Sequence, residues 1–211
     1  MADNYIGKKM EDFYSGKSTS LVKKRPSLKQ LLLKNRSYRG YDNGYEVRAD
    51  QLRRIIEVNC ATPSAMNQQV LRFRPVLVDE SDKVLPFIRM GGALPELHLP
   101  LPGTEPKAFI VICSTVDEGR YVDIDLGIAA QSMLLQAVEI GLNGICIAAF
   151  DKTAIKQSLS LQYEPLLILA IGKGAEKIEL TDISPTESHA YYRREGVHYV
   201  PKLRVEDLII K

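Results

Sequence analysis

The sequence contains few of the residues that build metal sites and disulfide frameworks. Its only cysteines are Cys60, Cys113 and Cys146, which are widely spaced and lie among apolar neighbours. This spacing matches neither a zinc site nor a set of disulfide bridges. We therefore expect three buried, reduced thiols.

Histidine is equally scarce. His98, His189 and His198 lie far apart in polar or loop-like segments, and we expect each to be an exposed side chain rather than a ligand. The motifs HExxH, GxSxG and GxxxxGK(S/T) are absent, and no GxGxxG follows an expected strand. These absences give no support to a metal-dependent hydrolase, a serine hydrolase or a common nucleotide-binding loop.

Long apolar runs are also missing. No segment is long and apolar enough to span a bilayer, and the start, "MADNYIGKKMEDFYSGK", lacks the apolar core of a signal peptide. The formal net charge of +2 is far from the basic excess of a dedicated nucleic-acid binder. We expect a cytoplasmic protein with no membrane or nucleic-acid partner.

The residues that are present have the composition of one globular domain. Hydrophobic residues make up 45% of the 211 residues and charged residues 26%, which are ordinary values for such a domain. We expect a polar N-terminal arm over residues 1–25 and a single domain over residues 26–211. The basic cluster at Val22–Pro26 fits a solvated arm, and a patch for nucleic acid or membrane is the alternative.

Local patterns predict helices and strands in mixed order. The periodicity of apolar residues predicts helices beginning at Ser27, at Asp50 and near Asp123; the first starts with a capping box completed by Gln30, and the third is apolar nearly all round. Apolar runs predict strands over residues 73–80, 108–114, 145–150 and 166–172. Because these elements do not alternate strictly, we predict an α+β layered domain.

Two groups of polar residues are candidates for a binding site. Arg36 and Arg39 could hold a phosphate, since guanidinium groups match its oxygens; the alternative is a solvated helix end that complements the helix dipole. The second group is "TPSAMNQQ" over residues 62–69, whose hydroxyl and amide groups can both donate and accept at the edge of a heteroaromatic ring. A proline-rich loop over residues 91–106 is a candidate lid.

Five segments, taken in order, resemble the nitroreductase family of flavin mononucleotide (FMN) enzymes. They are "NRSYRGY", "ATPSAMNQQVLRF", "DIDLGIAAQSMLLQAVEIGLNGICIAAFD", "LAIGKGAE" and "VPKLRVEDLI". The resemblance extends from about Leu31 to Ile210. Asn35 stands where many members have a further arginine, and Val70 and Leu71 replace a common Pro-Trp pair.

The resemblance implies a fold, a cofactor and a set of ligands. The fold is a layered sandwich with a central, mostly antiparallel sheet flanked by helices and a C-terminal extension toward the partner of a homodimer, with FMN at the subunit interface. The implied FMN-binding residues are Arg36, Ser37, Arg39, Ser64, Ala65, Asn67, Gln69, Ala148, Ala149, Lys202 and Arg204, with Asn67 reaching the flavin from the partner.

The implied activity is electron transfer from NADH or NADPH to a small acceptor, nitroaromatic or quinone-like, by hydride transfer through the flavin N5. The chemistry belongs to the flavin, so we assign no catalytic side chain and no metal. The alternatives are a flavin-binding protein without turnover, and a relative that uses the same fold for reductive dehalogenation or flavin fragmentation.

Overall fold

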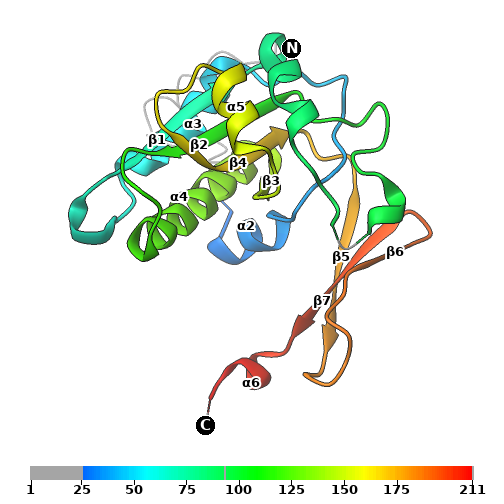
Figure 1. Ribbon diagram of the computed structural model, residues 1–211. Helices are drawn as coiled ribbons and strands as arrows, with labels where there is room; N and C mark the ends of the chain where they lie inside the picture. The colour runs from blue at the N-terminus through cyan, green and yellow to red at the C-terminus, as the bar shows by residue number, and fades with distance from the viewer. Residues whose placement is uncertain (1–25, 93, 211) are drawn as a thin grey trace, which may run out of the picture.

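A four-stranded sheet forms the centre of the computed structural model, which describes residues 26–92 and 94–210 (Figure 1). The predicted arm over residues 1–25 lies outside the described residues. Each strand is antiparallel to its neighbours. In spatial order the strands are β1 (Leu71–Val76), β2 (Ala108–Ser114), β4 (Glu164–Gly172) and β3 (Asn143–Ile147).

Strand β2 lies inside this sheet because its sequence, "AFIVICS", is apolar on both faces. All seven of its residues are buried. Ala108, Ile110 and Ile112 join one core cluster, whereas Phe109 and Val111 join the other. Successive side chains of a strand point to opposite faces, so this strand supplies both cores, and the sheet must be covered on both sides.

Helices provide the two covers. On one face lie α3 (Ala49–Glu57) and α4 (Arg120–Glu139), with buried Leu52 from α3 and buried Met133 from α4. On the other face lie α5 (Lys152–Ser158) and 3₁₀ turns within Val78–Phe87, which contribute Ile155 and Val84. The predicted α+β layered sandwich with a central antiparallel sheet is confirmed.

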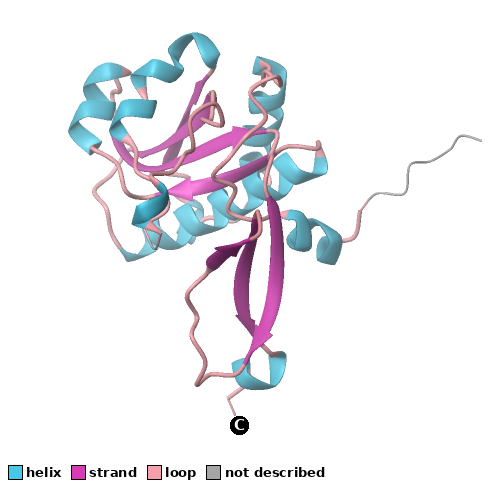
Figure 2. Ribbon diagram, turned by 90° about the vertical axis from the view of Figure 1, so that its right-hand side faces the viewer, coloured by secondary structure: helices cyan, strands magenta, loops and turns pink. Residues whose placement is uncertain are grey.

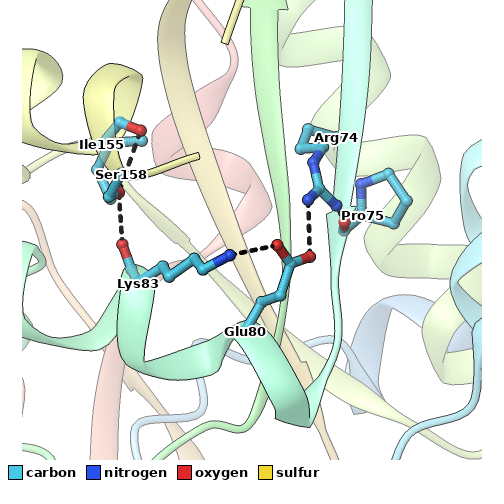
Figure 3. Close-up of polar contacts among 6 residues, drawn as sticks. All are labelled: Arg74, Pro75, Glu80, Lys83, Ile155 and Ser158. Atoms are coloured by element: carbon cyan, nitrogen blue, oxygen red, sulfur yellow. Dashed lines mark hydrogen bonds and ion pairs between the residues drawn. The ribbon is translucent and has the colours of Figure 1, made fainter. Parts of the chain in front are cut away.

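A chain of polar contacts fixes the 3₁₀ segment to its neighbours (Figure 3). Arg74 of β1 forms an ion pair with Glu80 at 2.6 Å, and Lys83 contacts the same carboxylate at 2.9 Å. Ser158 of α5 then donates a hydrogen bond to the Lys83 carbonyl at 2.8 Å. These contacts join the 3₁₀ segment and α5, which cover the second face of the sheet, to each other and to strand β1.

The C-terminal part of the chain forms a separate sheet. Its strands are β5 (Lys177–Ile183), β6 (Tyr192–Arg194) and β7 (Val197–Leu203), in the order β5-β7-β6. In Figures 1 and 2 this sheet extends away from the body and carries α6 (Val205–Leu208) near the C-terminus. None of the strands predicted from the sequence falls in this sheet.

The remaining helix, α2 (Leu28–Lys34), begins as the capping box predicts. The side chain of Ser27 accepts from the Gln30 amide, and the Gln30 side chain accepts from the Ser27 amide. Some predicted bounds need correction: the first strand ends at Val76 rather than residue 80, and the strand predicted over residues 145–150 is Asn143–Ile147. Helix α5 was not predicted. Within the described residues no helix is long and apolar enough to cross a membrane.

Candidate functional site

A cavity of about 360 Å³ lies where the end of α2, strand β3 and the C-terminal sheet meet. Its volume is in the range of small-molecule sites. We call it the basic cavity. It is lined by Asn35, Arg36, Ser37 and Arg39 after α2, by Gln131 and Leu134 of α4, by Gly144, Ile145 and Cys146 of β3, and by Ile178, Tyr191, His198, Val200 and Lys202.

The segment after α2 follows strand β3 because its backbone pairs with it. Ser37 forms a parallel bridge with Gly144, and the Tyr38 amide donates to the Gly144 carbonyl at 3.3 Å. Asn35 also donates from its side chain to Gln131 of α4 at 3.4 Å. These contacts place Arg36 and Ser37 at the cavity wall.

Gly144 permits this close approach because it has no Cβ. A Cβ there would lie 2.6 Å from the Ala170 carbonyl oxygen and 2.7 Å from a Leu134 methyl carbon. We expect Gly144→Ala to lower the free energy of unfolding by about 1–3 kcal/mol, the usual cost of overpacking. Urea unfolding measures it. Gly127→Ala on α4, where a Cβ meets nothing within 4 Å, should be neutral or stabilising; equal losses in both variants would refute the steric explanation.

Three cations face the basic cavity. Arg36 donates to the Leu32 carbonyl at 2.6 Å, and burial lowers the pKa of its guanidinium. Arg39 is 9% exposed and lies over the Tyr191 ring, 4.7 Å from its centroid. Lys202 is exposed on β7. Among residues 26–92 and 94–210, no carboxylate forms an ion pair with any of these three, so the cavity attracts anions.

A buried carboxylate behind the cavity holds the arginine segment in place. Glu176 accepts hydrogen bonds from the backbone amides of Arg39 and Gly40 and forms an ion pair with Arg193 of β6. Its side chain is only 10% exposed. Because Arg193 balances the charge of Glu176, the Arg39 guanidinium, which donates from one nitrogen to the Ser37 carbonyl at 3.0 Å, keeps its other nitrogens for a ligand in the cavity.

The residues predicted from "TPSAMNQQ" lie elsewhere in this chain. Ser64 and Gln69 line a second cavity of about 230 Å³, and Asn67 is exposed. The Gln69 side chain donates to Asn67 Oδ1 at 3.1 Å. Within one chain this group therefore lies outside the basic cavity. That Asn67 reaches the flavin of a partner subunit stays a prediction.

This loop has an unusual backbone that a buried acid holds in place. Met66, Asn67 and Gln69 have positive φ values of 51°, 54° and 50°, a conformation that non-glycine residues adopt only where the surroundings impose it. The carboxylate of Asp125, 5% exposed on α4, accepts from the Ala65 amide at 2.9 Å. The loop is thus presented to the outside in a fixed shape.

Three other predicted residues lie near or beyond the basic cavity. Ala148 and Ala149 are exposed directly after β3, whose residues form one wall, and the Ala149 carbonyl accepts from the Arg89 amide at 2.8 Å. Arg204 precedes α6 and does not line the cavity. The predicted late basic pair is therefore divided: Lys202 lines the cavity and Arg204 does not.

Two predictions about single side chains were wrong. His198 is 3% exposed rather than a surface residue. Cys60 and Cys146 are exposed, and only Cys113 is buried. The sequence signal for His198 is its place in "VHYV", where alternating apolar residues mark a strand. Cys60 is the last residue of the 3₁₀ turn that follows α3.

The proline-rich loop borders a smaller cavity beside the basic one. This cavity has a volume of about 160 Å³ and is lined by Leu99, Leu101 and Thr104 of the loop. Arg39 and His198 line both cavities. The predicted role of residues 91–106 as a lid stays a prediction, since none of the loop's described residues, 91–92 and 94–106, lines the basic cavity.

Comparison with known proteins agrees with the sequence motifs. Residues 95–173 match the model of the Nitroreductase family. The resemblance to the nitroreductase family is confirmed. The curated relative "Putative nitroreductase MJ1384" from Methanocaldococcus jannaschii is 33% identical over 57 residues, which are 27% of this chain and 29% of the relative. The match thus spans under a third of that nitroreductase relative.

Solved structures show that the chain has the nitroreductase fold. A nitroreductase family protein from Streptococcus pneumoniae TIGR4 has a TM-score of 0.63 at 17% identity, covering 88% of this chain and 100% of the other. NfnB from Sphigopyxis sp. strain HMH, described as an FMN and NADPH-dependent nitroreductase, has a TM-score of 0.61 at 19% identity, covering 71% and 89%.

Proposed function

We propose that the protein is an FMN-dependent oxidoreductase that passes electrons from NADH or NADPH to a small oxidised acceptor, nitroaromatic or quinone-like. The observation that carries the proposal is the basic cavity, where Arg36, Arg39 and Lys202 gather around one small-molecule space. The family match over residues 95–173 and the cofactors in the description of NfnB support it.

The donors in this cavity fit a phosphate-bearing cofactor. The Nε atoms of Arg36 and Arg39 are buried and have no hydrogen-bond partner among the described residues. Buried donors without partners are costly, and phosphate oxygens are strong acceptors for guanidinium groups. Ser37 adds a hydroxyl at the same wall, so this end of the cavity would hold the phosphate.

The chain would bind and orient the cofactor rather than supply a reacting group. When bound, FMN would take a hydride from a nicotinamide and pass the electrons to the acceptor. Arg36, Arg39 and Lys202 would neutralise the phosphate, and Gln131 would offer an amide to polar groups further along. The apolar side chains of Ile145 and Val200 would exclude water from the cavity walls.

We also propose that residues 26–211 act as one FMN-binding domain in a homodimer. The loop over residues 64–69 has a fixed, exposed shape but lies outside the basic cavity of its own chain. A second copy could bring Asn67 to that cavity. Helix α4 supports the pairing, since Tyr121 and Ile124 are exposed on its outer side at 59% and 47%.

Thiol labelling tests the position of the cofactor. Cys146 is partly exposed but lines the basic cavity, where desolvation by the surrounding protein atoms raises the pKa of its thiol to about 11. We expect a maleimide to label Cys146 slowly and saturating FMN to block it, as read by peptide mass spectrometry. Cys113, buried with a pKa of about 11, should react only in denaturant and so serves as a folding control. Equal labelling of Cys146 with and without FMN would place the flavin elsewhere.

The activity is tested by an absorbance spectrum followed by anaerobic addition of NADH and then NADPH. We expect flavin bands that bleach with one donor and return with a nitroaromatic or a quinone. A flavin that stays oxidised with both donors would favour a binding protein without turnover. A colourless protein that FMN cannot reconstitute would overturn the assignment of Arg36, Ser37 and Arg39.

A further inference from the structure

His198 separates the basic cavity from the smaller cavity behind it. It lies on β7, is 3% exposed and lines both spaces together with Arg39. Val200 and Lys202 follow at alternate positions of the same strand and also line the basic cavity. Side chains at alternate positions share one face of a strand, so the imidazole belongs to the wall that carries Lys202.

One ring nitrogen of the imidazole has no hydrogen-bond partner in the part of the chain that the structure describes. Nδ1 of His198 is buried and forms no hydrogen bond with the described residues. The neighbouring carboxylate, Glu176, is already occupied by Arg193 and by the amides of Arg39 and Gly40. Buried polar atoms normally have a hydrogen-bond partner. A ligand that binds in the adjoining cavity would supply this partner for Nδ1.

The charged and titratable groups around His198 come from four segments. Arg39 follows α2, Arg193 lies opposite His198 on β6, Glu176 precedes β5, and the Tyr191 ring lies 5.1 Å away, centroid to centroid. Burial, followed by the positive charges of Arg39 and Arg193, lowers the pKa of His198, and Glu176 opposes them. The imidazole is therefore neutral at neutral pH in the protein alone.

We propose that His198 is a further ligand-contacting residue of the basic cavity, which takes up a proton from solvent as a phosphomonoester binds beside Arg36, Arg39 and Lys202. This inference rests on the proposed function, with FMN as the phosphomonoester. A phosphate near the ring adds negative charge on the side where the protein alone presents arginines, which favours the imidazolium. An imidazolium has two N–H donors, so Nδ1 can then donate.

The sign of the pH dependence follows from this coupling. When the pKa of a group rises on ligand binding, its protonated form favours the complex. This contribution to affinity is fully present at pH values below the pKa of the ligand-free protein. That contribution is lost as pH rises through the pKa of the complex. The second ionisation of the phosphate, near pH ~6, acts in the opposite direction because the dianion binds cations better. The contribution of His198 must therefore be read at the histidine itself.

NMR of the full chain provides that measurement. The sequence has three histidines, and His98 and His189 are exposed, so they serve as internal references. Without ligand, we expect the titration midpoint of His198 to lie below the ordinary value for a histidine. With saturating FMN it should move above its ligand-free position by about one pH unit or more. No such ligand-induced movement is expected for the two references, which do not line the basic cavity.

Two variants add an independent measurement. Calorimetry in buffers of different ionisation enthalpy counts the protons taken up as FMN binds. We expect uptake for the wild type and for His189→Gln, and a smaller uptake for His198→Gln. His198→Gln should also weaken FMN binding roughly tenfold below about pH 6.5 while leaving riboflavin, which has no phosphate, unchanged.

The outcomes separate this inference from the proposed function. If FMN binds, as shown by quenching of its fluorescence, and the His198 midpoint does not move, the inference is overturned and the proposed function stands. If FMN does not bind, both are overturned. The NMR experiment uses the wild type alone, so failure of His198→Gln to fold does not affect it.

Discussion

Replacing Glu176 with alanine should lower the free energy of unfolding by about 3 kcal/mol. The carboxylate is 10% exposed and holds Arg193 together with the amides of Arg39 and Gly40. Its removal leaves one guanidinium and two amides without their acceptor. Breaking a buried pair costs about 3–5 kcal/mol, and we place this case at the lower end because Arg193 keeps 24% of its side-chain surface exposed.

Urea unfolding of matched variants measures this effect. Glu179→Ala is the control, since its ion pair with Lys177 is exposed on both sides and should be worth about 0–1 kcal/mol. Glu176→Gln keeps an acceptor for the amides but loses the charge, so it should fall between the two. If Glu176→Ala is no more destabilising than Glu179→Ala, Glu176 does not hold the arginine segment.

Replacing Arg36 with alanine should weaken FMN binding roughly ten- to a hundredfold, because a hydrogen bond to a charged group is worth about 1.5–3 kcal/mol. The guanidinium lines the basic cavity, and its buried Nε has no hydrogen-bond partner among the residues that the structure describes. The guanidinium donates to the carbonyl of Leu32, a residue of the neighbouring helical turn. The variant should therefore fold with only a small loss of stability.

Flavin fluorescence quenching tests this with both FMN and riboflavin. We expect the loss to be confined to FMN, since riboflavin lacks the phosphate. Lys34→Ala is the matched control: Lys34 is an exposed cation in the last turn of α2 and does not line the cavity. An equal loss for both variants would mean that general charge attraction, rather than a contact from Arg36, produces the affinity.

Elements with strong local signals were predicted from the sequence. The capping box at Ser27 involves residues three apart, and β2 is an uninterrupted apolar run that matches its predicted range. The buried face of α4, with Ala129, Met133 and Ala137, follows the 3.6-residue period of a helix. In each case the information lies within a few consecutive residues.

Elements whose stability depends on distant contacts were missed. Strands β5 and β7 pair with each other across about twenty residues of chain, so the partner that makes each segment a strand lies outside any local window of sequence. Glu176 is 137 residues from Arg39, whose amide it binds. His198 appeared to be a surface residue because its neighbours Arg39 and Glu176 come from other segments.

The candidate site was predicted in part for the same reason. Arg36, Ser37 and Arg39 form a compact motif, and the structure places all three at one cavity with Lys202. The walls of this cavity, however, also include Gln131, Tyr191 and His198, and no sequence motif connects these residues to the arginine segment. The predicted group over residues 64–69 lies outside this cavity. If a second chain brings the group there, as proposed, the structure of a single chain does not contain that contact.

The basic cavity has its walls in two sheets that share no hydrogen-bonded strand pair. Any local opening that separates β7 from β3 therefore destroys the cavity, whereas fraying of an edge such as β1 leaves it whole. A ligand at a hundred times its dissociation constant opposes the first kind of opening by about 2.7 kcal/mol and the second not at all. Amide hydrogen exchange would thus slow with ligand concentration in the C-terminal sheet, and the occupancy of a small-molecule site would set how long that sheet stays attached to the body.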